Sequence, residues 1–234
     1  MHIDDEPLRP GEVRAFVKYR NHPRPAPQRY FVGWDIGQSQ DYSAVAVLKK
    51  TDAGTYVVNH LERLSLGMSY PDQINHVYSL VNRKPLAGAD TTVCLDKTGV
   101  GAPVYDTTRK KGINAIGLTL HGGDSVSWDE DRMAVKAPKK DVIGCLVVLA
   151  QCGSIKIAKG LPYGDTLLKE LRDYQIKFNP NTANVSFGNG REAEHDDLVL
   201  SVAIPLWIAE NRYPPVQPVA RFISVGGRGV KRIG

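Results

Sequence analysis

The stretch that most constrains the fold runs from Tyr30 to Leu48 and reads YFVGWDIGQSQDYSAVAVL. Apolar residues lead to Asp35, a polar turn follows, and an Ala/Val-rich run begins at Ala44. This order predicts a buried strand, a tight turn and a second, antiparallel strand. Asp35 ends the first strand, where burial is unfavourable unless the carboxylate is paired or holds a metal. The alternative is an ordinary hairpin whose aspartates cap the turn.

The next part of the chain predicts that this hairpin belongs to a mixed sheet. Thr55–Leu64 is typical of a third strand, which completes an antiparallel meander, and Ser69 is typical of the cap that starts a helix. A β-rich run ending at Asp96, a helix ending at Gly112 and a further strand then indicate a parallel crossover unit. We therefore expect an α/β domain with a mixed central sheet, antiparallel hairpins first and parallel crossovers after, flanked by helices.

The second half of the chain is less regular. Residues 121–137 are polar and poorly periodic, and they predict a mobile loop. After it we expect a helix over 138–153, a short strand over 154–158 and a helix over 165–174. A loose hairpin over 179–190 and a final apolar helix over 195–210, bent at its proline, complete the predicted elements.

Composition indicates one folded domain with two appendages. Residues 1–29 are rich in proline and arginine and predict a linker-like arm, residues 30–211 carry the core pattern, and residues 212–234 predict a flexible basic tail. The acidic, polar N-terminus is not typical of a signal peptide, and no apolar run approaches the roughly 20 residues that span a bilayer. The three cysteines lack metal-ligand spacing and predict reduced core thiols. The net charge of +5 permits a polyanionic partner without requiring one.

Acidic residues recur at the ends of predicted core elements. Asp35 and Asp96 each end a strand, and Asp196 with Asp197 opens the last helix. Carboxylates that meet at one sheet edge repel one another unless a cation neutralises them, and oxygen-only ligands suit Mg²⁺ or Mn²⁺. Two such ions about 4 Å apart stabilise both the attacking water and the leaving oxygen when a phosphodiester is hydrolysed. Ordinary helix capping is the alternative for Asp196 and Asp197.

Three segments resemble the nuclease domain of phage terminase large subunits, which has an RNase H-like fold. They are WDIGQSQDYSAVAV around Asp35, VCLDKTGVGAPVYD around Asp96 and AEHDDLVLSVAIPLW around Asp197. The intervening stretches DVIGCLVVLAQCGSIKIA and TLLKELRDYQIKF are also similar to that family, so that the resemblance covers about residues 30–210.

The resemblance implies roles for individual residues. Asp35, Asp96 and one of Asp196 and Asp197, with Asp197 favoured, would be the catalytic acids and the ligands of two Mg²⁺ or Mn²⁺ ions. Two further candidates are Asp41, which would hold a water of the metal shell, and His195, which would orient a group or accept a proton, although a histidine before a helix is also a common cap neighbour.

The resemblance also implies an activity and partners. The protein would be a metal-dependent endonuclease that cuts double-stranded DNA during phage genome packaging, in the host cytoplasm and with no membrane contact. Its partners would be a terminase ATPase domain, the small terminase subunit and the portal. The sequence contains no Gly-Lys pair and therefore no GxxxxGK[ST] loop, so we expect an excised or separately encoded nuclease without the ATPase motor.

Basic residues are the candidates for DNA contacts, since phosphates are bound by Lys and Arg with little sequence preference. Lys97 would approach the scissile phosphate, or it is a solvated loop lysine. The alternative for every other candidate is likewise a solvated surface charge. The other candidates are Arg109, Lys110, Lys111, Arg132, Lys136, Lys139, Lys140, Arg228, Lys231 and Arg232.

Three other interpretations stay open at this point. Another RNase H-like nuclease, such as a Holliday-junction resolvase, shares the acid pattern. An actin-like ATP-binding module also begins with Asp-x-Gly and a hairpin, but its two phosphate loops would here be only about sixty residues apart, in a chain too short for two lobes. A DNA-binding module without catalysis is the third alternative.

Overall fold

The computed structural model of the protein describes residues 28–37, 41–177 and 196–213. This part of the chain forms one eight-stranded sheet and five helices. The strands are β1 (Arg29–Asp35), β2 (Ala44–Lys50), β3 (Tyr56–Arg63), β4 (Asp90–Asp96), β5 (Ala115–His121), β6 (Ser127–Trp128), β7 (Ala134–Pro138) and β8 (Ile155–Ile157). The helices are α1 (Tyr70–Val81), α2 (Gly101–Lys110), α3 (Lys139–Gln151), α4 (Gly164–Lys177) and α5 (Asp197–Arg212).

The sheet is mixed, and its strand order is β6-β7-β5-β4-β1-β2-β3-β8. Strands β1, β2 and β3 form the predicted antiparallel meander. Strand β4 pairs in parallel with β1, β5 in parallel with β4, and β7 in parallel with β5. The carboxyl ends of β1, β3, β4, β5 and β7 therefore share one edge of the sheet, which we call the carboxyl edge.

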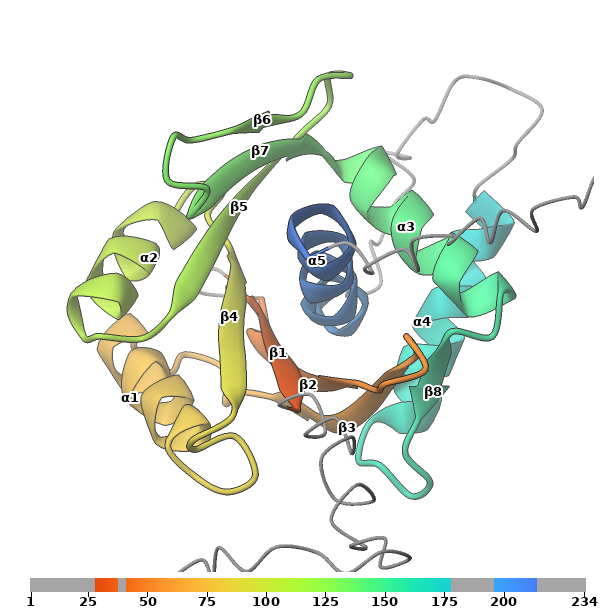
Figure 1. Cartoon of the computed structure of the whole chain (residues 1–234), viewed down its shortest axis with the longest axis horizontal. Coiled ribbons are helices and arrows are strands. Elements are labelled where there is room, and N and C mark those ends of the chain that lie inside the picture. The colour runs from red at the N-terminus through yellow and green to blue at the C-terminus, as the bar shows by residue number, and fades with distance from the viewer. Residues whose placement is uncertain (1–27, 38–40, 178–195, 214–234) are drawn as a thin grey trace, which may run out of the picture.

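The two faces of the sheet are covered by different helices. Figure 1 shows α5 enclosed by the curved sheet, with α3 and α4 on the same side and α1 and α2 on the outer face. Alternation along β1 explains the two layers, since Phe31 packs toward α5 while Val32 packs toward α1 and α2. Helix α5 is buried along almost its whole length, which explains its apolar sequence on all sides.

Helix α5 approaches β1 closely because one residue of the strand has no side chain. A Cβ atom at Gly33 would lie 1.8 Å from the Ser201 carbonyl oxygen and 2.6 Å from the Pro205 ring. Pro205 has no backbone N–H, so the Ser201 carbonyl four residues earlier lacks its usual helical donor. The α5 backbone can therefore lie directly on the strand at Gly33, and this contact fixes the start of α5 near the end of β1.

Most sequence predictions of elements are confirmed, including the mixed α/β sheet and the Ser69 cap, whose hydroxyl accepts the Asp72 N–H. The mobile loop predicted over 121–137 is wrong, because this segment contains β6 and β7. Strand β7 pairs with β5 along its whole length and extends the parallel sheet, and the two-residue β6 covers its outer edge. The hairpin predicted over 179–190 lies outside the described residues, as do most of the predicted arm and tail.

The three cysteines are free thiols, as expected, but they are not all core residues. Cys94 is buried and Cys145 is half-buried, whereas Cys152 at the end of α3 is exposed.

Within the described ranges, none of the helices combines the length and the apolar character that crossing a membrane requires.

Candidate active site

The fold brings the predicted acids together at the carboxyl edge. Asp35 is the last residue of β1, and Asp96 is the last residue of the neighbouring parallel strand β4. Asp197 is the first residue of α5, one turn before the Ser201 carbonyl that lies against Gly33. The close approach of α5 to β1 therefore places a helix N-terminus beside two strand ends.

Burial and mutual repulsion dominate the electrostatics of these acids. Asp35 is 9% exposed and Asp197 is 5% exposed. Burial, followed by the negative charges of Asp96, Asp196 and Asp197, holds the pKa of Asp35 well above its usual range. Burial also raises the pKa of Asp96, although the Thr98 backbone N–H donates to its Oδ1 at 2.7 Å and opposes that rise. The four carboxylates therefore act on one another as a cluster.

A lysine contacts this cluster from helix α3. Lys139 is the first residue of α3, directly after β7, and its Nζ lies 3.0 Å from Asp196 Oδ2. Its charge also lowers the pKa of Asp35 and of Asp96, against the larger effect of burial. A cation in the first turn of a helix is disfavoured by the helix dipole, so the acids, and not the helix, explain this lysine.

Two residues that the sequence analysis did not select complete the surroundings of Asp197. The Arg63 guanidinium binds both oxygens of Asp197, with Nε 2.7 Å from Oδ2 and Nη2 3.0 Å from Oδ1. The same Nη2 lies 2.8 Å from Glu170 Oε1. Burial, followed by the charge of Asp197, raises the pKa of Glu170 to about 7. The sequence shows Arg63 as a charged residue near the end of a predicted strand, and this position could have marked it as a site candidate. The sequence does not show which acid it binds.

The other residues predicted for the site are exposed, partly exposed or outside the described residues. Asp41 is exposed at the hairpin turn. His195 lies outside the described residues. The Lys97 ammonium lies 4.5 Å from the centre of the Tyr105 ring, which gives it an aromatic neighbour as well as solvent. The fold thus gathers Asp35, Asp96, Asp196 and Asp197 and leaves Asp41 at the surface.

The donor set of the cluster fits a hard divalent cation, since it consists of carboxylate oxygens alone and carries excess negative charge. In the described part of the chain, no three His, Cys, Asp or Glu side chains stand at the spacing of a formed metal site. The ion pairs to Arg63 and Lys139 provide the positive charge near Asp197 and Asp196 in this structure.

A mixed sheet that begins with an antiparallel meander, with acids at the ends of its first and fourth strands and at the start of its last helix, defines an RNase H-like nuclease. The sequence matches the terminase RNaseH-like domain family over residues 32–203. The chain belongs to this family and is an RNase H-like nuclease domain of the terminase large-subunit type. This membership favours the nuclease interpretation over the actin-like module.

Solved structures agree with this assignment. The large terminase nuclease of thermophilic phage G20c is 26% identical, with a TM-score of 0.51 over 78% of this chain and 82% of its own, and it is also known with bound zinc. The Mn-soaked nuclease domain of human cytomegalovirus terminase is 10% identical, with a TM-score of 0.51 over 86% of this chain and 90% of its own. The HK97 bacteriophage large terminase is 10% identical, with a TM-score of 0.50 over 80% of this chain and 40% of its own. At 10% identity, the cytomegalovirus and HK97 structures show only that the fold is shared.

A search of curated proteins gives no match to this sequence.

Proposed function

We propose that this nuclease domain cuts double-stranded DNA by metal-dependent hydrolysis and so makes the cuts that start and end phage genome packaging. Asp35, Asp96 and Asp197 would hold two Mg²⁺ or Mn²⁺ ions. The observation that supports this proposal is the crowding of buried acids at the carboxyl edge, which raises the pKa of Asp35 through burial and three neighbouring carboxylates. Such crowding is unfavourable for the fold alone and becomes favourable when a dication is bound.

The surroundings of Asp196 and Asp197 support Asp197 as the third ligand. The Asp197 side chain is 7% exposed and is bound by Arg63, whereas the Asp196 side chain is 39% exposed and is paired with Lys139. Bound to these acids, two divalent ions would activate a water molecule for in-line attack and stabilise the leaving oxygen of a phosphodiester. Asp196 would then keep the Lys139 ammonium beside the cluster, where it is placed to contact the phosphate.

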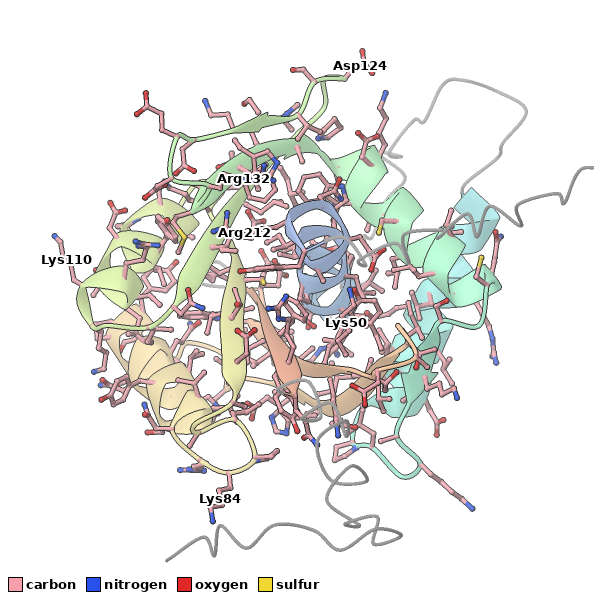
Figure 2. All side chains as sticks on the ribbon, viewed as in Figure 1. Lys50, Lys84, Lys110, Asp124, Arg132 and Arg212 are labelled. Atoms are coloured by element: carbon pink, nitrogen blue, oxygen red, sulfur yellow. The ribbon has the colours of Figure 1, made fainter. Side chains whose placement is uncertain are left out.

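Lysines beside the carboxyl edge would bind the DNA backbone. Lys136 is exposed on β7. Lys140 follows Lys139 in the first turn of α3 and pairs with Asp124, which is labelled in Figure 2. Contacts to phosphates carry no sequence information directly, so we expect cleavage with little sequence preference. In the host cytoplasm the domain would act with a terminase ATPase domain, the small terminase subunit and the portal.

A plasmid cleavage assay with EDTA, Mg²⁺ or Mn²⁺ tests this function. We expect nicking and linearisation with either metal, no cleavage with EDTA, and loss of cleavage in Asp35→Asn and Asp96→Ala. Asp106→Ala is the matched control, because Asp106 is exposed on α2 away from the cluster, and it should cleave like the parent. Retained cleavage by folded Asp96→Ala would remove Asp96 from the mechanism, and cleavage in EDTA would overturn the metal requirement.

A further inference from the structure

The most complete polar contact at the carboxyl edge belongs to a residue outside the acid cluster. Arg63 ends β3, and its side chain is only 16% exposed. Its fork binds both oxygens of Asp197 through Nε and Nη2, at 2.7 and 3.0 Å, and these two residues are 134 positions apart in the chain. Two parallel N–H···O bonds fix the rotation of a carboxylate, which a single bond does not.

The guanidinium is itself held in place by groups from other elements. Its central carbon lies 5.4 Å from the centre of the Tyr42 ring and 5.9 Å from the centre of the Tyr163 ring. Nη2 also donates to Glu170 Oε1 on α4 at 2.8 Å. Arg63 therefore joins the first hairpin, β3, α4 and α5 at one point.

Tyr163 adds a second observation at the same point. Its φ angle is 59°, a left-handed conformation that bulky residues rarely adopt. Tyr163 immediately precedes α4, and the ring that this conformation presents lies near Arg63. Strained residues of this kind persist where their surroundings determine them, and they gather at functional sites.

We propose that Arg63 is a positioning residue, which holds the Asp197 carboxylate in the orientation that binds a divalent cation together with Asp35. The inference rests on the proposed function. An ionised carboxylate has about four lone-pair sites, so the two taken by Arg63 leave others for a metal ion. The opposite model, in which Arg63 blocks Asp197 until a cation displaces it, requires a mobile guanidinium. The contacts to Glu170, Tyr42 and Tyr163 favour a fixed one.

The test is direct Mn²⁺ binding by isothermal titration calorimetry, in the parent and in Arg63→Lys. Lysine keeps the positive charge but loses the planar fork. We expect Mn²⁺ to bind about 10–100-fold more weakly, the range found when partners that orient metal ligands are removed. The Mn²⁺ concentration for half-maximal plasmid cleavage should rise by a similar factor, and excess Mn²⁺ should restore the rate. Circular dichroism of Arg63→Lys without metal detects a defect in folding separately, because bound metal also stabilises the folded state.

Arg29→Lys is the matched control. Arg29 also pairs with an aspartate, Asp90, at 2.6 Å and also lies over an aromatic ring, that of Tyr213 at 4.4 Å, but it occupies the opposite end of the sheet. We expect its Mn²⁺ affinity to equal that of the parent. Tyr163→Asn gives a second route if Arg63→Lys does not fold, since asparagine tolerates the left-handed conformation and removes the ring. It should weaken Mn²⁺ binding several-fold.

The outcomes separate the two proposals. Unchanged or tighter Mn²⁺ binding in folded Arg63→Lys would overturn the positioning role of Arg63 while leaving the nuclease site in place. Absence of Mn²⁺ binding by the parent would overturn the metal site itself and, with it, the role of Arg63.

Discussion

Asp35 shows at the scale of a single residue that the acid cluster opposes folding when no cation is bound. Its carboxylate is buried, and three neighbouring acids raise its pKa. An acid whose pKa is raised in the folded state binds more protons there than in the unfolded chain, so stability falls as the pH rises above the usual aspartate range.

Asp35→Asn keeps the side-chain volume and removes this charge. In EDTA at pH 8 we expect the melting temperature to rise by about 2–6 °C, since 1 kcal/mol corresponds to about 2–4 °C in a domain of this size. The gain should shrink as the pH falls below the usual aspartate pKa, because Asp35 then becomes protonated in the unfolded chain as well as in the folded state. Scanning calorimetry of the parent and of the exposed control Asp106→Asn measures it. A lower melting temperature would show that the neighbouring acids do not destabilise Asp35.

At the scale of secondary-structure elements, the site depends on the contact between β1 and α5. Gly33→Ala would place a Cβ atom 1.8 Å from the Ser201 carbonyl oxygen, and backbone on both sides prevents a local adjustment. We expect the unfolding free energy to fall by at least about 1–3 kcal/mol, the usual effect of overpacking, and Mn²⁺ to bind more weakly because Asp35 and Asp197 separate.

Urea unfolding measures the first effect and calorimetric titration the second. Gly144→Ala is the control, because a Cβ atom at Gly144 in α3 would meet nothing within 4 Å. Alanine there should leave stability unchanged or raise it by up to about 1 kcal/mol, the difference in helix propensity. If Gly33→Ala were as stable as the parent, the approach of α5 to β1 would not be fixed by this glycine.

At the scale of the whole molecule, the basic residues divide between the two ends of the sheet. Lys136 and Lys140 lie toward the carboxyl edge, whereas Lys110 ends α2, which starts beside Asp96 and runs about 15 Å back along the sheet. Figure 2 shows Lys110 projecting outward at the far end of that helix. The total charge of +5 therefore does not by itself locate a DNA surface.

We expect Lys136→Ala and Lys140→Ala each to weaken DNA binding and to reduce the slope of log K against log salt by about 0.9 for each phosphate that the variant no longer neutralises. Lys110→Ala should leave both quantities unchanged. Fluorescence anisotropy with a labelled duplex, at several salt concentrations and in Ca²⁺ or EDTA to prevent cleavage, measures both. Equal weakening in all three variants would indicate that DNA covers both ends of the sheet.

The sequence by itself determined the elements and the acids. Hydrophobic alternation and turn residues predict β1 to β3 and the crossover around Asp96, because these patterns reflect local backbone preferences. The resemblance to terminase nucleases then indicated Asp35, Asp96 and Asp197. The short strands β6 and β7 were missed, since strands of two and five residues leave little periodicity and form only when β5 offers its free edge.

The tertiary structure alone decided which charged groups meet. Arg63 and Asp197 are far apart in the chain, and no spacing rule links a strand end to a helix start across such a distance. Lys139 resembles any surface lysine until the parallel pairing of β5 and β7 brings the start of α3 to the acids. Side-chain chemistry is local in the sequence, but the electrostatics of a buried site depends on distances in space. The acids were therefore predictable, and the cations that balance them were not.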